Sequence, residues 1–453
     1  MIKNNLYFKN NSGKTRTSPA ISAALAVFIC LLVFVLVLTV ILNGIIEKKI
    51  EKSFHERYHT CSLIVSGLRY NFFKNRFSCK SLVIKKESGV SCTAGPVSVS
   101  GIGWLGLLYS PVNRERAFDG TAVEVNDVYL NGAGYALSCK RLTFSVRDGR
   151  IRAVEIDLKT LSNNERFFAA RRYRTTRFRL NIPELIISGL DGSKFVDGRS
   201  FKAHSIVLNG PSLDALVDKY AAVDKKITRE LMPNEMMITV NKQVFIEKLK
   251  VISGRVTYGE EYAPGAVPAT VTFDNINLMA DNISNNGQQN GVSLFQVRAN
   301  FMQSGAVDLN VVMSLSSRAF SLQYSGSLGT MDMRKLNAFL EHSEYIRIDS
   351  GTIQKITFDI GVSDGHATGA MKALYKDLKI TVLSRKTGGS NGIINKLSSL
   401  LMNHIAIRRE NMADTKTPFK TAKIEYIRKP QNTFLQFLWF SLRSGVLDVL
   451  FLM

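Results

Sequence analysis

The chain has 453 residues, of which 59 are Lys or Arg and 37 are Asp or Glu, so its formal charge is +22. Apolar residues make up 45% of the sequence, which excludes a disordered tail protein, and the ordinary Gly and Pro content excludes a fibrous one. The length allows about three domains of usual size or one long β architecture. A basic exterior favours approach to anionic membranes, although charge of this kind also simply keeps proteins soluble.

An uncharged stretch between Arg16 and Glu47 is the first predicted element. Its centre, ISAALAVFICLLVFVLVLTVIL, would rise about 33 Å as a helix, enough for a bilayer core of about 30 Å. No cleavage site follows it, so we expect an uncleaved transmembrane helix over residues 18–46 rather than a signal peptide or a buried core helix. Residues 1–17 carry basic but no acidic side chains, which predicts a cytoplasmic tail with the remainder on the other side of the membrane.

Residues 47–60 continue as a predicted helical stalk, because Ile50, Phe54 and Tyr58 recur every four residues. After it the apolar period changes to two, in phrases such as KSLVIKK and TAVEVNDVYLN, which predicts a β-rich region over residues 61–211. A first hairpin turning near residues 71–76 makes opposing residue numbers sum to about 147. Cys61 then faces residue 86 and not Cys79. The four cysteines beyond the span allow three pairings if oxidised, and free thiols are the alternative.

A helical stripe interrupts the β pattern at residues 212–233. It begins behind a Ser212 cap, continues through Leu216 and Tyr220, and stops near Pro233, so it predicts an amphipathic helix that divides the β region in two. A second β-rich region is expected over residues 234–390, interrupted by a short helix between Met331 and His342. Its strands are predicted at Val244–Tyr258, Ala269–Ala280, Leu294–Met302, Ala306–Leu315, Phe320–Ser327 and Thr352–Val362.

Few helices are available to cover the apolar face of such a long antiparallel sheet. Two sheets can close on each other as a sandwich, which composition alone favours. Alternatively, one sheet can curl into an open groove whose apolar lining is occupied by lipid.

Residues 391–453 predict two amphipathic helices and a strand. Apolar residues from Ile393 to Ile405 share one helical face, and AKIEYIRK predicts a strand near Ile424–Ile427. The segment from Thr433 to Met453 is apolar but contains two charges, each costing about 2.5–3.5 kcal/mol near the middle of a span. We expect this helix to pack into a groove mouth or lie on a membrane surface.

The sharpest motif match is HERYH, in which His55, Glu56 and His59 reproduce the H-E-x-x-H pattern of zinc metallopeptidases. Two imidazoles one helical turn apart can hold zinc while the carboxylate activates water. However, a catalytic zinc needs a third protein ligand, and the extended form of the motif is absent. Phe54 and Tyr58 give the helix an ordinary apolar edge, so we interpret the match as chance and keep a membrane metallopeptidase as a remote alternative.

An arginine-rich run, ERFFAARRYRTTRFRLNI, interleaves basic and aromatic side chains. Such runs clamp phosphates or stack on bases, and outside the cytoplasm anionic lipid headgroups are better candidates than nucleic acid. The alternative is an ordinary strand with Phe178, Leu180 and Ile182 on one face and arginines on the solvated one. The candidate headgroup contacts are Arg172, Arg174, Arg177 and Arg179.

No Walker loop, G-x-S-x-G elbow or C-x-x-C pair occurs, and the remaining histidines are scattered. We therefore predict neither a cofactor nor an enzymatic activity.

The order of these elements resembles the AsmA-like family of bacterial envelope proteins, which is related to the TamB and YhdP type of bridge-like lipid transporters. The phrases that carry the resemblance are IPELIISGLDG, HSIVLNGPSLD, LKVISGRVTYGEE with VTFDNINLMADNIS, the segment GSLGTMDMRKLNAFLEHSEYIRIDSGTIQKITFDIGVSDGHATGAMKALYKDLKITVL, and the endings SLLMNHIAIRREN and QFLWFSLRSGVLD. They span most of residues 20–450.

The resemblance implies a mainly β fold, an elongated antiparallel sheet curled over a hydrophobic groove (a β-taco) behind an inner-membrane helix, with the bulk of the chain in the periplasm. It also implies a role in phospholipid transport or outer-membrane homeostasis, with membrane lipids as partners and other envelope proteins as further candidates. A non-enzymatic scaffold built on a closed sandwich is the rival hypothesis. The candidate lining residues are Val271, Phe273, Ile276, Leu278, Val307, Leu309, Val311 and Met313.

Overall fold

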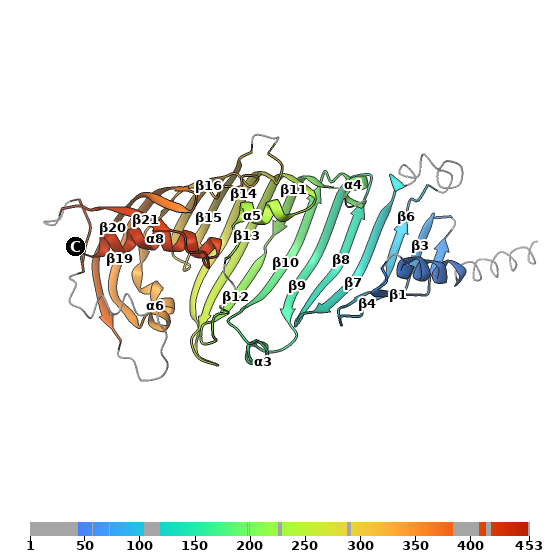
Figure 1. Cartoon of the computed structure of the whole chain (residues 1–453), viewed down its shortest axis with the longest axis horizontal. Helices are drawn as coiled ribbons and strands as arrows, with labels where there is room; N and C mark the ends of the chain where they lie inside the picture. Colours follow the sequence, from blue (N-terminus) through green and yellow to red (C-terminus); the bar gives the residue numbers. More distant parts are fainter. Residues whose placement is uncertain are drawn as a thin grey trace, which may run out of the picture.

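The computed structural model describes residues 44–56, 58–71, 73–103, 118–196, 198, 200–224, 229–287, 291–383, 407–413 and 418–451. These residues form one long sheet of 21 strands with a few helices (Figure 1). The fold is therefore mainly β, as predicted, and its strands form a single sheet rather than the two sheets of a sandwich. The predicted cytoplasmic tail, and the transmembrane helix except for its last three residues, lie outside the described residues.

The first half of the sheet contains β1 (Cys61–Ser66), β2 (Arg69–Asn71), β3 (Arg76–Cys79), β4 (Ser81–Lys86), β5 (Ser91–Ala94), β6 (Val97–Ser100), β7 (Ala122–Gly132), β8 (Tyr135–Ser145), β9 (Arg150–Thr160), β10 (Thr176–Ser188), β11 (Ser200–Asn209) and β12 (Ser212–Asp218). The second half contains β13 (Gln243–Glu261), β14 (Ala269–Ser284), β15 (Ser293–Phe301), β16 (Gly305–Met313), β17 (Leu322–Leu328), β18 (Met331–Asp332), β19 (Ile346–Ser363), β20 (His366–Val382) and β21 (Thr421–Ile427). The second-half strands overlap every strand predicted there.

Helices are short apart from the first and the last. They are the helix at residues 44–56, α3 (Asn164–Ala169), α4 (Gly192–Val196), α5 (Pro233–Thr239), the 3-10 helix η2 (Met333–Leu336), α6 (Asn337–Ser343) and α8 (Phe434–Leu450). The predicted short helix after Met331 is confirmed as η2 and α6, and the terminal apolar helix is confirmed as α8. The predicted stalk ends earlier than expected, because the chain must turn back to begin β1 beside it. The amphipathic segment predicted between Ile393 and Ile405 lies outside the described residues.

The first hairpin has the predicted register. Cys61 opposes Lys86 and Asn71 opposes Arg76, so each pair sums to 147. The four described cysteines are free thiols. β1 pairs only with β4, and β2 pairs only with β3. These two strands therefore form one edge of the sheet.

The helix predicted over residues 212–233 is wrong. Ser212–Asp218 forms β12, which is antiparallel to β10 and parallel to β13. Pro233 begins α5 instead of ending a helix, since a proline ring suits the first helical turn, where no N–H is required. The expected all-antiparallel sheet is also corrected, because β11 and β12 both run parallel to β13. Residues 219–224 and 229–242 belong to the crossover that a parallel pair needs, and one continuous sheet replaces the two predicted regions.

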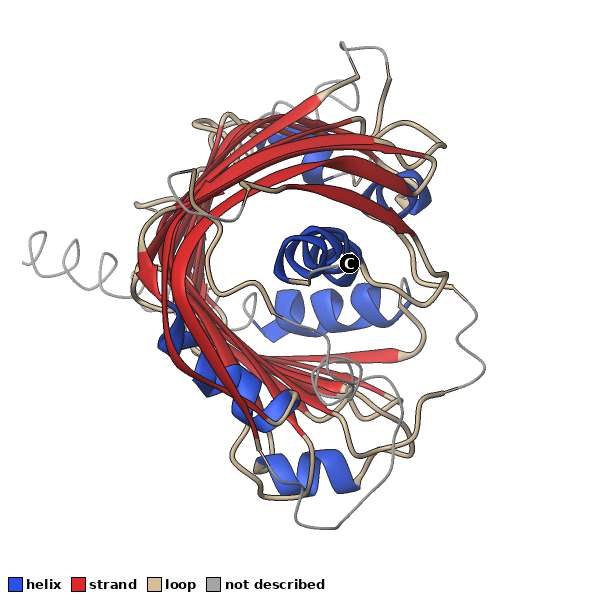
Figure 2. Cartoon of the chain, turned by 90° about the vertical axis from the view of Figure 1, so that its left-hand side faces the viewer, coloured by secondary structure: helices blue, strands red, loops and turns tan. Residues whose placement is uncertain are grey.

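The strands bend along a line that crosses the sheet. We call this line the crease, and the parts of the sheet on its two sides the walls. Mid-strand residues with positive φ lie along it: Asp127 (49°), Glu155 (53°), Ser253 (53°) and Asn275 (51°). The registers place Asp127 and Glu155 on either side of Lys140, and Ser253 beside Gly210 between β11 and β12. Left-handed backbone of this kind bends a strand and shifts its alternation. The bend is seen end-on in Figure 2, where the sheet curves around the helices at its centre.

The alternation of apolar residues shifts phase at the crease. On β9, Ile151 and Ala153 precede Glu155, whereas Ile156 and Leu158 follow it. Their partners on β8 and β10 are apolar in both cases. The shift therefore keeps apolar side chains on the concave face of both walls.

Both edges of the sheet are capped by a helix. At the first edge, the backbone N–H of Val65 donates to Glu51 Oε1 (2.8 Å). At the last edge, the N–H of Lys423 donates to Asp448 Oδ2 (2.9 Å) and that of Glu425 donates to Ser444 Oγ (3.3 Å). These acceptors occupy edge amides that otherwise pair with a strand of another chain.

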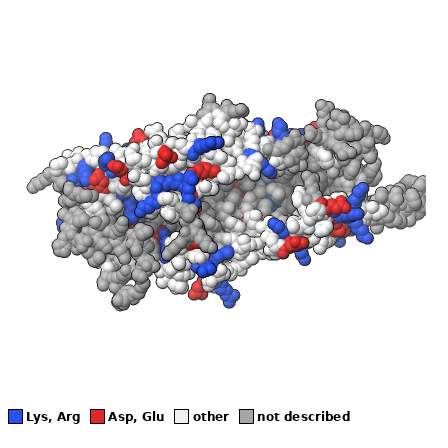
Figure 3. All heavy atoms as spheres, in the orientation of Figure 1, with Lys and Arg blue, Asp and Glu red and all other residues white. Residues whose placement is uncertain are grey.

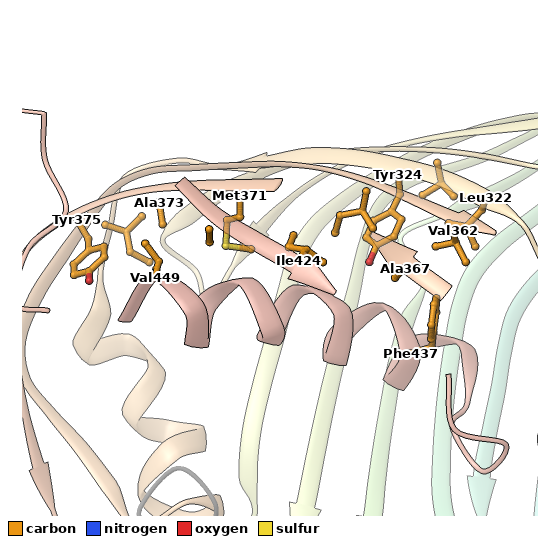
Figure 4. Packing of buried hydrophobic residues seen from close by; sticks show 14 of the residues in the cluster. Leu322, Tyr324, Val362, Ala367, Met371, Ala373, Tyr375, Ile424, Phe437 and Val449 are labelled. Atoms are coloured by element: carbon orange, nitrogen blue, oxygen red, sulfur yellow. The ribbon is translucent and has the colours of Figure 1, made fainter. Parts of the chain in front are cut away.

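The main core lies where α8 packs on the concave face (Figures 2 and 4). Phe437 of α8 contacts β20 near Ala367, and Val449 lies near Ala373 and Tyr375 (Figure 4). Opposite it, η2 and α6 pack against β14 and β19. The C-terminal part of the curl is therefore filled by the protein's own helices.

Candidate functional site: the open half of the groove

The concave face of β7 to β14 forms what we call the open half of the groove. Its apolar side chains lie in register across neighbouring strands; Leu137, Leu158, Leu180 and Leu213 form one such row. All four are only half-buried, and Phe178, two residues before Leu180, is 42% exposed. Figure 3 shows a recessed, mostly uncharged surface between rims that carry charged residues.

The concave face of β16 to β21 forms the filled half. There the same alternation produces fully buried side chains, among them Tyr324, Ile360, Met371 and Ile424, each at most 2% exposed. α8 is the covering element on this wall, and its contacts are with β20 and β21. Among the described residues, no helix packs over the concave face of β7 to β10 in the same way. α3 and α4 lie at the strand ends (Figure 1).

The eight lining residues predicted from sequence all lie on the concave face. Val311 opposes Phe295, which opposes Ala280, and the register continues to Leu278, Val251 and, beyond the bulge, Phe273. Their surroundings differ. Val311 (7% exposed) and Met313 (4%) belong to the core beneath α8, with Val271 and Leu309 packed against that core. Phe273, Ile276, Leu278 and Val307 are half-buried and outside it, so these four are the better candidates for contact with a ligand.

A polar cluster lies on the concave side where the open half meets the filled half. Glu260 accepts hydrogen bonds from the hydroxyls of Tyr258 (2.6 Å) and Tyr262, and Lys219 Nζ lies 2.8 Å from its Oε1. Burial and the negative charge of Glu260 raise the pKa of both tyrosines well above the usual range, so both stay protonated donors. Apolar lining therefore ends at a group of charges.

One ion pair crosses from α8 to the segment after α6. Arg443 Nη2 lies 3.4 Å from Glu344 Oε1. The pKa of Glu344 is raised to about 7 by burial, which Arg443 opposes and the nearby Glu260 reinforces. The pair ties together the two helices that fill the C-terminal part of the groove.

The predicted headgroup arginines do not form one site. Arg177 is wrong as a headgroup contact, because its side chain is only 4% exposed and donates to Asp214 Oδ2 at 2.7 Å. Arg179 donates to Asn164 and lies, like Arg177, on the convex face opposite Phe178. Arg174 donates to the carbonyl of Lys219 (2.9 Å), and Arg172 stacks on Tyr173. Arg172 and Arg174 therefore stay candidates at the rim, and Arg179 stays an exposed candidate on the convex face, whereas Arg177 is buried in an ion pair.

The H-E-x-x-H residues do not share a helical face. The helix reaches residue 56, while His59 lies in a turn. His55 Nδ1 lies 3.2 Å from the carbonyl oxygen of Cys61, and Glu56 pairs with Lys52. In the part of the chain that the structure describes, no three His, Cys, Asp or Glu side chains are grouped as metal ligands.

Two further features were missed from the sequence. The lining positions on β7 to β10 had the necessary alternation, yet only second-half strands were singled out. The polar cluster had no local signal, because Lys219, Glu260 and Glu344 are far apart in the chain.

Within the described ranges, no helix is both long and apolar enough to cross a bilayer. No protein-family model matches the chain, and no curated protein is significantly similar to it.

Proposed function

We propose that this protein holds lipid acyl chains in the open half of its groove, as a membrane-anchored envelope protein that takes part in phospholipid transport or outer-membrane homeostasis. The observation that carries the proposal is the contrast along one concave face. Where α8 covers it, apolar side chains are buried; across β7 to β10 equivalent rows have no covering helix among the described residues. Covering such a surface gains about 0.8 kcal/mol per buried CH₂ group, and acyl chains supply that cover.

The geometry supports a long ligand rather than a compact one. The half-buried rows continue from strand to strand, and neighbouring strands are about 4.8 Å apart. From β7 to β14 there are seven strands, counting β11 and β12 as one, so the rows that cross them extend for roughly 29 Å. The charged rims and the apolar recess in Figure 3 match an amphipathic ligand. The inner-membrane location and the AsmA-like relationship are part of the proposal and rest on the sequence.

Site-specific photocrosslinking tests the function. A photoreactive phenylalanine analogue replaces Phe178 or Phe273 in the open half, or Tyr324 beneath α8 as the matched control. Lipid adducts are expected at the first two positions and not at the third, because α8 excludes a ligand there. Folded protein with no adduct at either open position contradicts the proposal.

A further inference from the structure

α8 lies in the groove at the place where a ligand of the open half would otherwise continue. Phe437 and Val449 are at most 1% exposed, and the Phe437 ring lies 5.4 Å from that of Phe320. α8 therefore fills the concave side along the last strands of this wall (Figure 4).

Close packing leaves no space for a chain between α8 and the sheet. A Cβ added at Gly445 meets Ile424 Cγ1 at 2.7 Å and Met371 Cβ at 3.4 Å. Both values are at or below ordinary van der Waals contact, so the backbone of α8 rests directly on β20 and β21. Ser441, one turn earlier, is fully buried and donates to the carbonyl of Phe437 (2.8 Å). Small residues at this contact are what allow the approach.

Polar contacts hold both sides of α8. Asp448 accepts from the N–H of Lys423 and pairs with Lys420 Nζ (3.1 Å), while Ser444 accepts from the N–H of Glu425. Arg443 reaches across the groove to Glu344. Moving α8 leaves two edge amides unpaired and exposes the largest side chains of the core, and unsatisfied amides and exposed apolar surface are both costly.

We propose that α8 is a permanent stopper, so that the groove is blind at its C-terminal end and lipid exchanges only through the long opening of the open half. This inference rests on the lipid-binding function proposed above. Lipid would then enter and leave through one region of the groove and would not pass from one end of the protein to the other. The charged cluster at Glu260, Lys219, Glu344 and Arg443 adds to the barrier, because acyl chains do not pass buried charges readily.

A disulfide between α8 and β20 tests the proposal in the full-length chain. Gly445→Cys and Met371→Cys place two Cβ atoms 3.4 Å apart, close to the mean of about 3.8 Å for disulfides. Ile424→Ala removes the Cγ1 atom that meets the new side chain, and the five native cysteines are replaced by serine. The same protein is compared oxidised and reduced, so any effect of the substitutions on folding is shared by both samples.

Exchange is measured as transfer of a fluorescent phosphatidylethanolamine between the protein and vesicles of phosphatidylethanolamine and phosphatidylglycerol. For a stopper, the rates of oxidised and reduced protein agree within about twofold. A tenfold or larger loss of rate on oxidation overturns the stopper and makes α8 a gate, while leaving lipid binding intact. Absence of bound lipid in both forms overturns the proposed function itself, and the stopper with it.

Hydrogen exchange of the native sequence gives an independent measurement. The amides of Lys423 and Glu425 are protected by α8 side chains, so their exchange rates are expected to be unchanged when lipid is loaded. Faster exchange at these two amides on loading shows that α8 moves, and contradicts the stopper.

Discussion

Strand β16 contains both environments on one face. Val307 and Leu309 are half-buried, whereas Val311 and Met313 further along the same face are 7% and 4% exposed. The residue types hardly differ, and the alternation with exposed Asp308 and Asn310 is the same. What differs is the cover, since Val311 and Met313 belong to the buried cluster that includes Phe437 and Val449 of α8, whereas Val307 does not. Apolar patterning therefore identifies which face is concave without identifying what fills it.

Truncating one phenylalanine in each half gives the largest expected contrast. Phe437→Ala removes a fully buried ring from the filled half and is expected to lower the free energy of unfolding by about 3–5 kcal/mol. Phe178→Ala, at 42% exposure in the open half, is expected to cost less than about 1 kcal/mol. Urea unfolding measures both. Equal losses contradict the division into filled and open halves.

Removing the edge cap of the filled half is the next largest change. Ser444→Ala with Asp448→Ala removes the acceptors of two edge amides, at a cost of roughly 1–3 kcal/mol for the pair. We also expect concentration-dependent self-association, because free strand edges pair with one another. Light scattering measures it.

The first edge supplies a matched control on a single helix. Glu51→Ala removes an acceptor of the Val65 amide, whereas Glu56→Ala removes only an exposed pair with Lys52. Self-association is expected for the first substitution and not for the second. Identical monomeric behaviour of the edge variants contradicts the role given to the two capping helices.

Burial of Glu344 between the filling helices predicts a pH dependence. The pKa of Glu344 is raised from its ordinary 4.5 to about 7, so the folded state binds this proton more tightly than the unfolded state does. Its contribution to stability is complete below pH 4.5 and is lost as pH rises through 7, by up to about 3 kcal/mol.

Glu344→Gln tests this dependence, because the neutral amide has no proton to lose. Between pH 5 and 8, the wild-type protein is expected to lose stability relative to the variant in urea unfolding at each pH. Parallel profiles for the two proteins contradict the raised pKa of Glu344.

The smallest predicted effect is at the crease, which both halves of the molecule depend on. Glu155 has a φ of 53° and only an exposed ion pair with Lys140. Glycine adopts this conformation without strain, so Glu155→Gly is expected to raise stability by up to about 1 kcal/mol and Glu155→Val to lower it by about 1–2 kcal/mol. The melting temperatures of both variants measure these changes. A lower melting temperature for Glu155→Gly than for the wild-type protein contradicts strain at this position.

The strands, the first hairpin register, α6 and α8 were predictable because each depends on nearby residues. Residues 212–233 were not, and Leu216 shows why. It is buried against Phe167 and Phe168 on the convex side, while Leu213 and Val217 of the same strand face the groove. A strand with apolar residues on both faces can match helical spacing, so periodicity alone misidentifies it. The parallel pairing and the polar cluster depend on residues distant in sequence and had no local signal.

The crease was also hidden, although its trace is visible in the sequence. TAVEVNDVYLN changes phase at Asn126 and Asp127, which a simple alternation count treats as one strand. When the apolar alternation changes phase at the same place in successive strands, it indicates a sheet that is bent across its strands. A flat sheet has no such change.

The most direct test of the account is the identity and amount of what co-purifies with the full-length chain. Solvent extraction followed by mass spectrometry is expected to recover one or more phospholipids per chain, and Leu158→Glu in the open half is expected to reduce that amount while leaving the urea midpoint nearly unchanged. Folded wild-type protein that carries no lipid contradicts the account, because the rows of the open half would then have to be covered by something other than acyl chains.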